Sequence, residues 1–126
     1  MTAPTLSPAA FTKSEIGWFC KLDDLEIVVP ASDDGPDAAA IELASEFLSR
    51  REAAEASAQR WLAHHLKLPG TNELGVLEVL AQPDRHGASV LLTYFNSEDQ
   101  YLWIDVGLHA TVRSRFDPLY VLVKYY

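Results

Sequence analysis

The stretch PDAAAIELASEFLSRREAAEASAQRWLAHHLKLPG, residues 36–70, decides the predicted fold because its apolar residues recur at steps of three and four. That spacing puts them on one face of an α-helix. The face consists of Ile41, Ala44, Phe47, Leu48, Ala54, Ala58, Trp61, Leu62 and Leu66. Pro36 suits the first helical position, and Pro69-Gly70 ends the helix after Leu68.

The middle of this helix is weakly apolar, since alanines are its only apolar residues from Ser49 to Arg60. Two explanations are open. Either a sheet approaches the helix closely there, or the chain breaks into two helices near Arg50-Arg51. Of the two, we predict one continuous helix over residues 36–68.

Two short aromatic and β-branched segments, Ile16–Cys20 and Leu25–Val29, precede the helix. The residues between them, 21–24, have the composition of a tight turn, and Pro30 ends the second segment. The sequence therefore predicts an N-terminal β-hairpin.

Residues 1–14 mix Pro, Ala, Ser and Thr without periodicity, which predicts a mobile arm unless Leu6 or Phe11 packs on the rest. A chain of 126 residues fits one domain, so we assign residues 15–126 to a single domain.

After Gly70 the apolar period becomes two, as in half-buried β-strands. The predicted strands lie near Leu74–Ala81, Ala88–Phe95, Tyr101–Val106 and Leu119–Tyr125, and residues 107–118 are either a further strand or a loop. The predicted core residues are Leu77, Val79, Leu92, Tyr94, Leu102, Ile104, Val121 and Val123. The fold class is α+β: an N-terminal β-hairpin and one long helix packed on an antiparallel β-meander.

Composition limits the function classes. A net charge of -8 disfavours nucleic acid, whose binding depends on lysine and arginine, and favours a basic protein partner. The single Cys20 excludes an internal disulfide and a multi-cysteine zinc site and fits a reducing cytoplasm. Neither a secretory leader pattern nor an apolar run of membrane-spanning length is present, so we expect a cytoplasmic protein that does not bind membranes.

Carboxylates crowd the segment DDLEIVVPASDDGPD, residues 23–37, which holds six acids and no basic residue. The spacing around Gly35 does not match a calcium-binding loop, so we predict no metal and no cofactor. Helix capping explains Asp33, Asp34 and Asp37 but not the others. We predict that one exposed acidic surface binds the partner; its acids are Asp23, Asp24, Glu26, Asp33, Asp34 and Asp37.

Two aromatic residues are further candidates for binding the partner. Tyr101 and Trp103 share one face of a predicted strand, and an exposed tryptophan is a common anchor of protein interfaces. We therefore add both to the partner-binding residues. The C-terminal residues 120–126 are apolar on both faces, so an alternative is a self-associating protein that forms a homodimer through this strand.

Catalysis is a further alternative. His65, Asp105 and His109 could form a two-histidine, one-carboxylate site in a small metal-dependent or acid–base enzyme. However, none of the common motifs of hydrolases, zinc proteases, nucleotide-binding loops or dinucleotide-binding proteins is present. We therefore assign no catalytic residue and predict a protein without enzymatic activity.

The layout resembles small uncharacterised bacterial domains of the polymorphic-toxin immunity type. The resemblance rests on the N-terminal hairpin, the acidic turn, the EFL step at residues 46–48, Trp61, and YLWIDVGLH at residues 101–109. It would cover residues 16–123. What the resemblance implies is a stoichiometric inhibitor whose acidic face covers the positively charged site of a toxin or nuclease.

Overall fold

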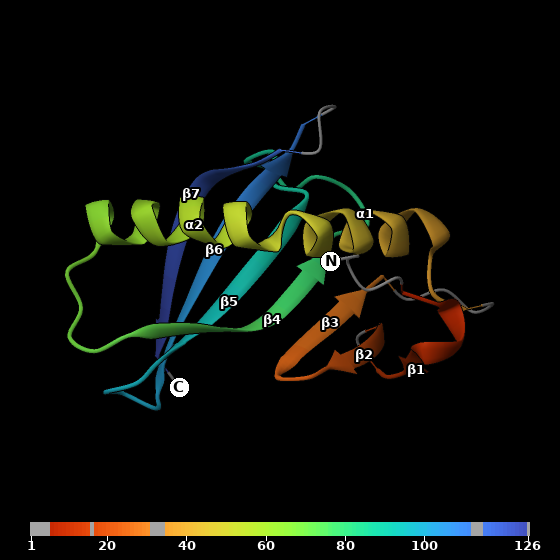
Figure 1. The fold of residues 1–126 in the computed structure, drawn as a ribbon, viewed down its shortest axis with the longest axis horizontal. Coiled ribbons are helices and arrows are strands. Elements are labelled where there is room, and N and C mark those ends of the chain that lie inside the picture. The colour runs from red at the N-terminus through yellow and green to blue at the C-terminus, as the bar shows by residue number, and fades with distance from the viewer. Residues whose placement is uncertain (1–5, 16, 31–34, 112–114, 126) are drawn as a thin grey trace.

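The computed structural model describes residues 6–15, 17–30, 35–111 and 115–125 and shows one seven-stranded sheet. Its strands lie side by side in chain order, with two helices across one face (Figure 1). The elements are η1 (Pro8–Ala10), β1 (Thr12–Lys13), β2 (Trp18–Leu22), β3 (Leu25–Val29), α1 (Ala38–Ser49), α2 (Arg51–His65), β4 (Asn72–Val79), β5 (Val90–Asn96), β6 (Leu102–Ala110) and β7 (Phe116–Tyr125). Neighbouring strands are antiparallel except β3 and β4, which are parallel.

The predicted fold class is wrong in its central element. In place of one long helix the chain forms α1 and α2, separated by Arg50 with φ -116° and ψ 14°. The sheet is also mixed rather than antiparallel, because the hairpin β2–β3 joins β4 in parallel and becomes part of the same sheet. An α+β composition remains.

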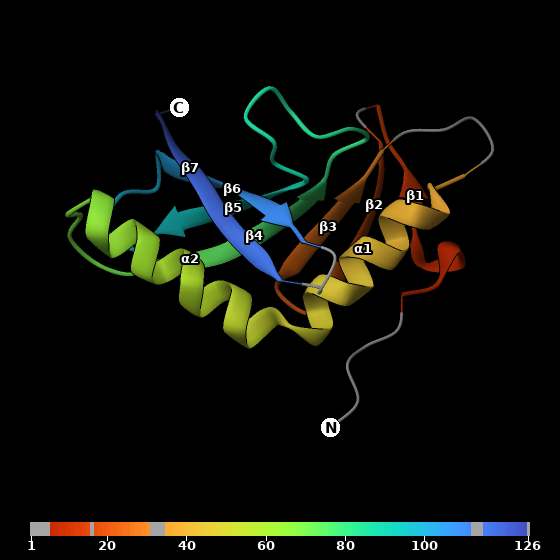
Figure 2. The same cartoon turned by 90° about the horizontal axis from the view of Figure 1, so that it is seen from above.

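The helix breaks because its two halves pack on different parts of the sheet. The main sheet contacts of α1 are with β3 and β4, whereas those of α2 are with β7, three strands beyond β4. Adjacent strands rotate by about 20° relative to one another, so a straight helix cannot follow both regions. The second view shows α1 and α2 running end to end with a bend between them (Figure 2). No side chain larger than alanine anchors residues 51–58 in the core to resist this bend.

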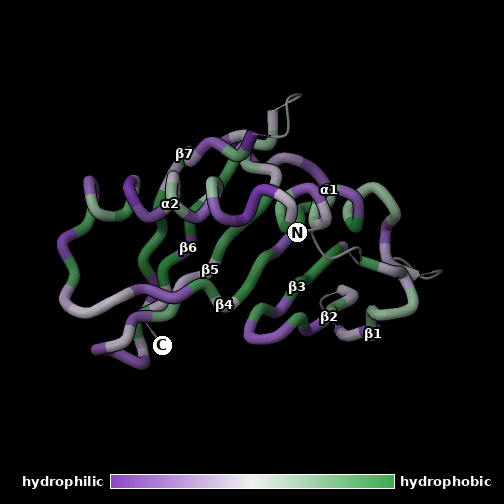
Figure 3. The backbone as a smooth tube through the Cα atoms, viewed as in Figure 1, coloured by the Kyte–Doolittle hydropathy of each residue, from purple (hydrophilic) through white to green (hydrophobic). Residues whose placement is uncertain are grey.

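The core lies between the two helices and the face of the sheet that they cover. The predicted core residues Leu77, Val79, Leu92, Tyr94, Leu102 and Ile104 are all buried there. Figure 3 shows hydrophobic segments along the inner strands, while much of α2 is hydrophilic. Val123 is exposed, so its assignment to the core is wrong. It lies near the C-terminal end of β7, and that end of the strand extends beyond the helices (Figure 1).

The N-terminal segment is joined to the domain. Leu6 and Phe11 are buried in the core, and β1 pairs with β2. Ile16, predicted to begin the first hairpin strand, lies outside the described residues.

The sequence left residues 107–118 undecided between a strand and a loop. In the structure, residues 107–110 continue β6 and 116–118 begin β7, while 112–114 lie outside the described residues. None of the helices in the described part is long and apolar enough to cross a membrane.

Candidate functional site

The face of the sheet opposite the helices, called the open face below, has none of the described helices over it (Figures 1 and 2). The strand register fixes which residues it carries. One row runs across six strands: Lys21, Glu26, Val76, Thr93, Asp105 and Leu122. A second row contains Glu73, Phe95, Trp103 and Lys124. Acidic and aromatic side chains therefore share this face.

A hollow of about 350 Å³ lies on the open face between the hairpin and β4. It is lined by Phe19, Lys21, Asp24, Glu26, Glu73, Leu74, Gly75, Val76 and Phe95. Its charged residues are exposed, and three are carboxylates while one is a lysine. We call this the acidic hollow, because its lining carries a net negative charge.

The backbone explains why the acidic hollow exists. Strands β3 and β4 pair only from Glu26 to Val28, so the first half of β4 pairs with no described strand on that side. The register of β4 shifts around Gly75, as in a β-bulge. A Cβ atom added at Gly75 would lie 2.0 Å from Phe95 Cε2, so the glycine lets the Phe95 ring lie against the strand.

An aromatic wall bounds the acidic hollow on the β5–β6 side. The rings of Phe95 and Trp103 meet edge to face, with centroids 5.0 Å apart and an angle of 88° between planes. This geometry is favourable for an aromatic pair. Trp103 is partly buried, so its ring supports that of Phe95 while part of it remains exposed.

A partly buried ion pair, with a buried aspartate and a half-exposed lysine, occupies the centre of the open face. Lys124 Nζ lies 2.6 Å from Asp105 Oδ2, and the Thr93 hydroxyl donates to Asp105 Oδ1 at 2.8 Å. Asp105 is one of only two buried polar or charged residues in the described chain. The lysine therefore neutralises a carboxylate that would otherwise lie unpaired in the sheet surface.

Glu78 lies near this pair, and burial followed by the charge of Asp105 raises the pKa of its carboxyl above 4.5, while Lys124 opposes the shift. A raised pKa in the folded state means that ionisation of Glu78 destabilises the fold. The favourable contribution of protonated Glu78 to stability is complete below pH 4.5 and is lost as the pH rises through the folded-state pKa of its carboxyl.

Glu78→Gln is therefore expected to raise stability at neutral pH and to flatten the pH dependence above 4.5. Urea denaturation at acidic and neutral pH measures both effects. Glu73→Gln, an exposed position on the same strand, is the matched control. Identical pH profiles for the two variants would contradict the assigned environment of Glu78.

Tyr120 lies on the open face at the end away from the acidic hollow. A Cβ atom at Gly107 would lie 2.3 Å from Tyr120 Cε2, so this ring also rests on a glycine. Its hydroxyl donates to Asp84 Oδ2 at 2.6 Å, and this bond lowers the pKa of the Asp84 carboxyl. Asp84 also accepts from the amides of His86 and Ala88. The bonds fix the β4–β5 loop beside the sheet.

The predicted partner-binding residues that the structure describes do not form one surface. Asp24 and Glu26 line the acidic hollow, and Trp103 supports its aromatic wall. Asp23 occupies the tight turn of the hairpin with a φ of 56°, a conformation that aspartate tolerates.

The other predicted residues lie elsewhere. Asp37 caps α1, accepting from the Ala39 amide at 3.4 Å, at the opposite end of β3 from the hairpin turn. Tyr101 is exposed in the turn before β6. Asp33 and Asp34 lie outside the described residues.

No protein-family model, curated protein or solved structure matches this chain.

The three residues of the enzyme alternative lie in separate environments. His65 stacks on Trp61 at the end of α2, with ring centroids 4.2 Å apart, on the helix side of the sheet. Asp105 lies on the open face. His109 Nδ1 is 3.2 Å from the carbonyl of Gly87. Within the described ranges, no three metal-binding side chains come together.

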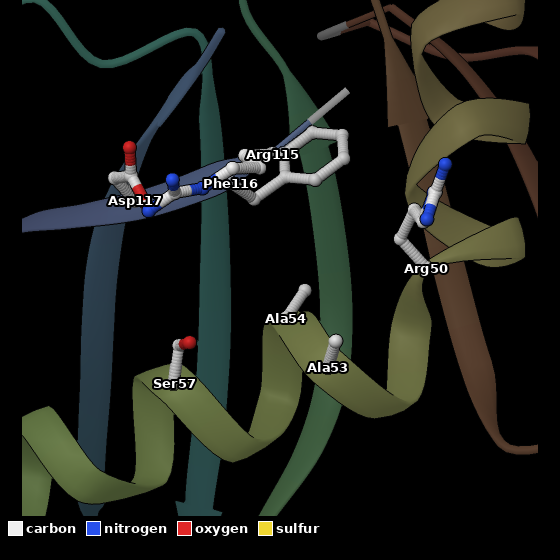
Figure 4. A pocket seen from close by; sticks show the side chains of 7 residues that line it. All are labelled: Arg50, Ala53, Ala54, Ser57, Arg115, Phe116 and Asp117. Carbon is white, nitrogen blue, oxygen red and sulfur yellow. Dashed lines mark hydrogen bonds and ion pairs between the residues drawn. The ribbon is translucent and has the colours of Figure 1, made fainter. Parts of the chain in front are cut away.

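A smaller hollow of about 160 Å³ lies between α2 and the start of β7 (Figure 4). It contains two arginines, but they do not converge on it. The Arg115 guanidinium bonds to Asp117 at 3.2 Å, and Arg50 extends from the helix junction in another direction. Alanines form much of the remaining wall. The acidic hollow is therefore the stronger candidate.

Sequence reasoning missed Phe19, Glu73, Gly75 and Phe95. One signal was present: a glycine inside a strand pattern often marks a bulge or a close approach of another group. Gly75 was such a position. The neighbours that it admits come from strands distant in sequence, and only the register shows them.

Proposed function

We propose that this protein is a non-enzymatic binding protein whose acidic hollow receives a positively charged segment of a partner protein. One observation carries the proposal. Three exposed carboxylates surround an aromatic-walled hollow on a sheet face that no helix covers. The net charge of -8 supports it further, because a negative protein attracts basic partners and accelerates their association.

An arginine side chain suits this site best. Its planar guanidinium can bond to Glu26 on one side and Glu73 on the other while it packs on the ring of Phe95. Exposed ion pairs contribute about 0.2–1 kcal/mol each, and an exposed cation–π contact about 0.5–1 kcal/mol. The hollow alone therefore binds an arginine side chain weakly, and a high affinity for the partner requires further contacts along the open face.

The kind of partner protein can also be proposed. The resemblance to immunity-type domains implies a basic toxin or nuclease whose positively charged site is covered in a stoichiometric complex in the cytoplasm. A toxin gene directly upstream of the gene for this protein would support that partner if the purified toxin is neutralised by this chain.

The charge-reversal variant Glu26→Lys/Glu73→Lys tests the binding site. We expect affinity for a synthetic arginine-rich peptide to fall about tenfold to a hundredfold, because two attractions are lost and two repulsions are added. Fluorescence anisotropy of the labelled peptide, at low salt and at about 0.15 M salt, measures the change. The wild-type protein should bind more weakly at the higher salt concentration.

The control is Glu42→Lys/Glu52→Lys, which changes the net charge equally at exposed positions on α1 and α2. It should retain most of the wild-type affinity. If both variants lose affinity to the same extent, binding depends on overall charge rather than on the acidic hollow, and the proposed site is wrong.

A further inference from the structure

Strand β7 forms one edge of the sheet, and among the described residues it pairs only with β6. Its outer edge therefore presents unpaired main-chain groups. Of the five large exposed hydrophobic residues in the described part of the chain, four lie on it: Leu119 at 38% exposure, Leu122 at 49%, Val123 at 38% and Tyr125 at 68%. The edge combines hydrogen-bonding capacity with apolar side chains.

Edge strands are usually protected by short length, proline or outward charges. The other edge strand, β1, has only two residues. In β7, protection is confined to its beginning, where Pro118 and the ion pair of Arg115 with Asp117 lie. Beyond Leu119 the only charge is Lys124, and its ammonium is held over the sheet by Asp105. Residues 119–125 thus lack the usual protection.

From this geometry we propose that the protein forms a homodimer in which residues 119–125 of β7 pair antiparallel with the same segment of a second copy. A two-fold axis perpendicular to the sheet brings like faces together, and the midpoint of the segment is Leu122. In this register Leu122 lies opposite its own copy, and Lys124 lies opposite Tyr120 rather than another lysine.

The charge of segment 119–125 favours a second copy of this chain as its binding partner, rather than the basic protein proposed for the acidic hollow. The segment 119–125 contains no carboxylate and one lysine, so it offers no attraction to a cationic protein. Its apolar residues match those of an identical strand. The pairing joins two sheets into one with both open faces on the same side.

The interface is small. Seven residues and four exposed side chains per copy amount to less than the roughly 800 Å² per partner of a standard interface. A dimer with a dissociation constant in the micromolar range is therefore expected. Repulsion between the two negative chains makes association stronger at higher salt, because charges further apart than about 8 Å are screened at physiological ionic strength.

Sedimentation velocity over a range of protein concentrations tests the proposal without any partner protein. The wild type should show a reversible monomer–dimer equilibrium. Leu122→Lys should weaken it at least about tenfold, since two buried lysines would oppose each other. Tyr101→Lys is the matched control, because it removes a large exposed hydrophobic residue that lies away from β7. A wild type that stays monomeric, or equal effects of the two variants, would overturn the proposal.

Cysteine cross-linking tests the register. In a Cys20→Ala background, Leu122→Cys should form an intermolecular disulfide on mild oxidation, because directly opposed residues have Cα atoms about 4.5–5.5 Å apart. Val123→Cys, whose two copies would be diagonal at roughly 7–8 Å, should cross-link much more slowly. Faster cross-linking at position 123 would refute this register.

Discussion

Replacement of Phe47 by alanine is expected to lower the free energy of unfolding by about 3–5 kcal/mol. Phe47 is fully buried and lies at the end of α1, next to the helix bend. Its ring meets that of Phe116 edge to face, with centroids 5.3 Å apart. Because the first buried residues of α2 after the bend are Ala54 and Ala58, small side chains cannot fill the space that the ring leaves, and a cavity remains.

Chemical denaturation followed by far-ultraviolet circular dichroism measures this loss. Glu42→Ala, at an exposed position on the same helix, is expected to change stability by less than about 0.5 kcal/mol. Phe47→Leu should lie between the two, since it retains part of the buried volume. A loss below about 1 kcal/mol for Phe47→Ala would show that this ring does not fasten the helices to β7.

Lys124→Met is expected to lower stability by about 2–4 kcal/mol, because it leaves Asp105 buried without its counter-ion. Asp105 is 8% exposed, and Glu78 adds a second carboxyl nearby. The lysine is 39% exposed, so solvent screens the pair in part and the effect stays below that of a fully buried ion pair.

The double variant Asp105→Asn/Lys124→Met separates charge from packing. An amide in place of the carboxylate should recover most of the stability, because no unpaired charge remains buried. Both variants are measured at equal, low protein concentration, since association adds concentration-dependent stability. Equal stability of the single and double variants would mean that Asp105 and Lys124 are not energetically coupled.

The strands were the predictable part of the fold. Alternation at Leu77, Val79, Leu92 and Tyr94 located β4 and β5 and identified the covered face, because a strand with one buried face must alternate. The turn residues Asp23-Asp24 located the hairpin in the same way. These are local properties, set within a few residues of each position.

The helix pair was less predictable. The apolar stripe is compatible with one helix or two, and the alanines between Ser49 and Arg60 were the only sign of a break. The choice depends on where the sheet lies beneath each half. Since α1 packs on β3 and β4 and α2 on β7, sheet twist bends the helix at Arg50. This information is absent from the helical sequence itself.

The candidate site was also only partly predictable from the sequence. A concentration of acids in the first third of the chain drew attention to Asp24 and Glu26, and strand alternation to Trp103. The structure adds Glu73 and Phe95, and it places Asp37 at a helix start. The register between strands sets which residues are neighbours on a sheet face, so Glu26 and Glu73 share a site although they are distant in sequence, while the nearer Asp37 does not belong to it.

By itself, the sequence determined the negative charge, the period of each element, the turn of the hairpin and the presence of a single thiol, since these depend on residue type and short-range spacing. Only the tertiary structure decided the break at Arg50, the parallel joining of β3 to β4 and the acidic hollow that follows from it. The physical reason is that pairing and packing between distant segments fix which side chains meet, and local preference does not encode those distances.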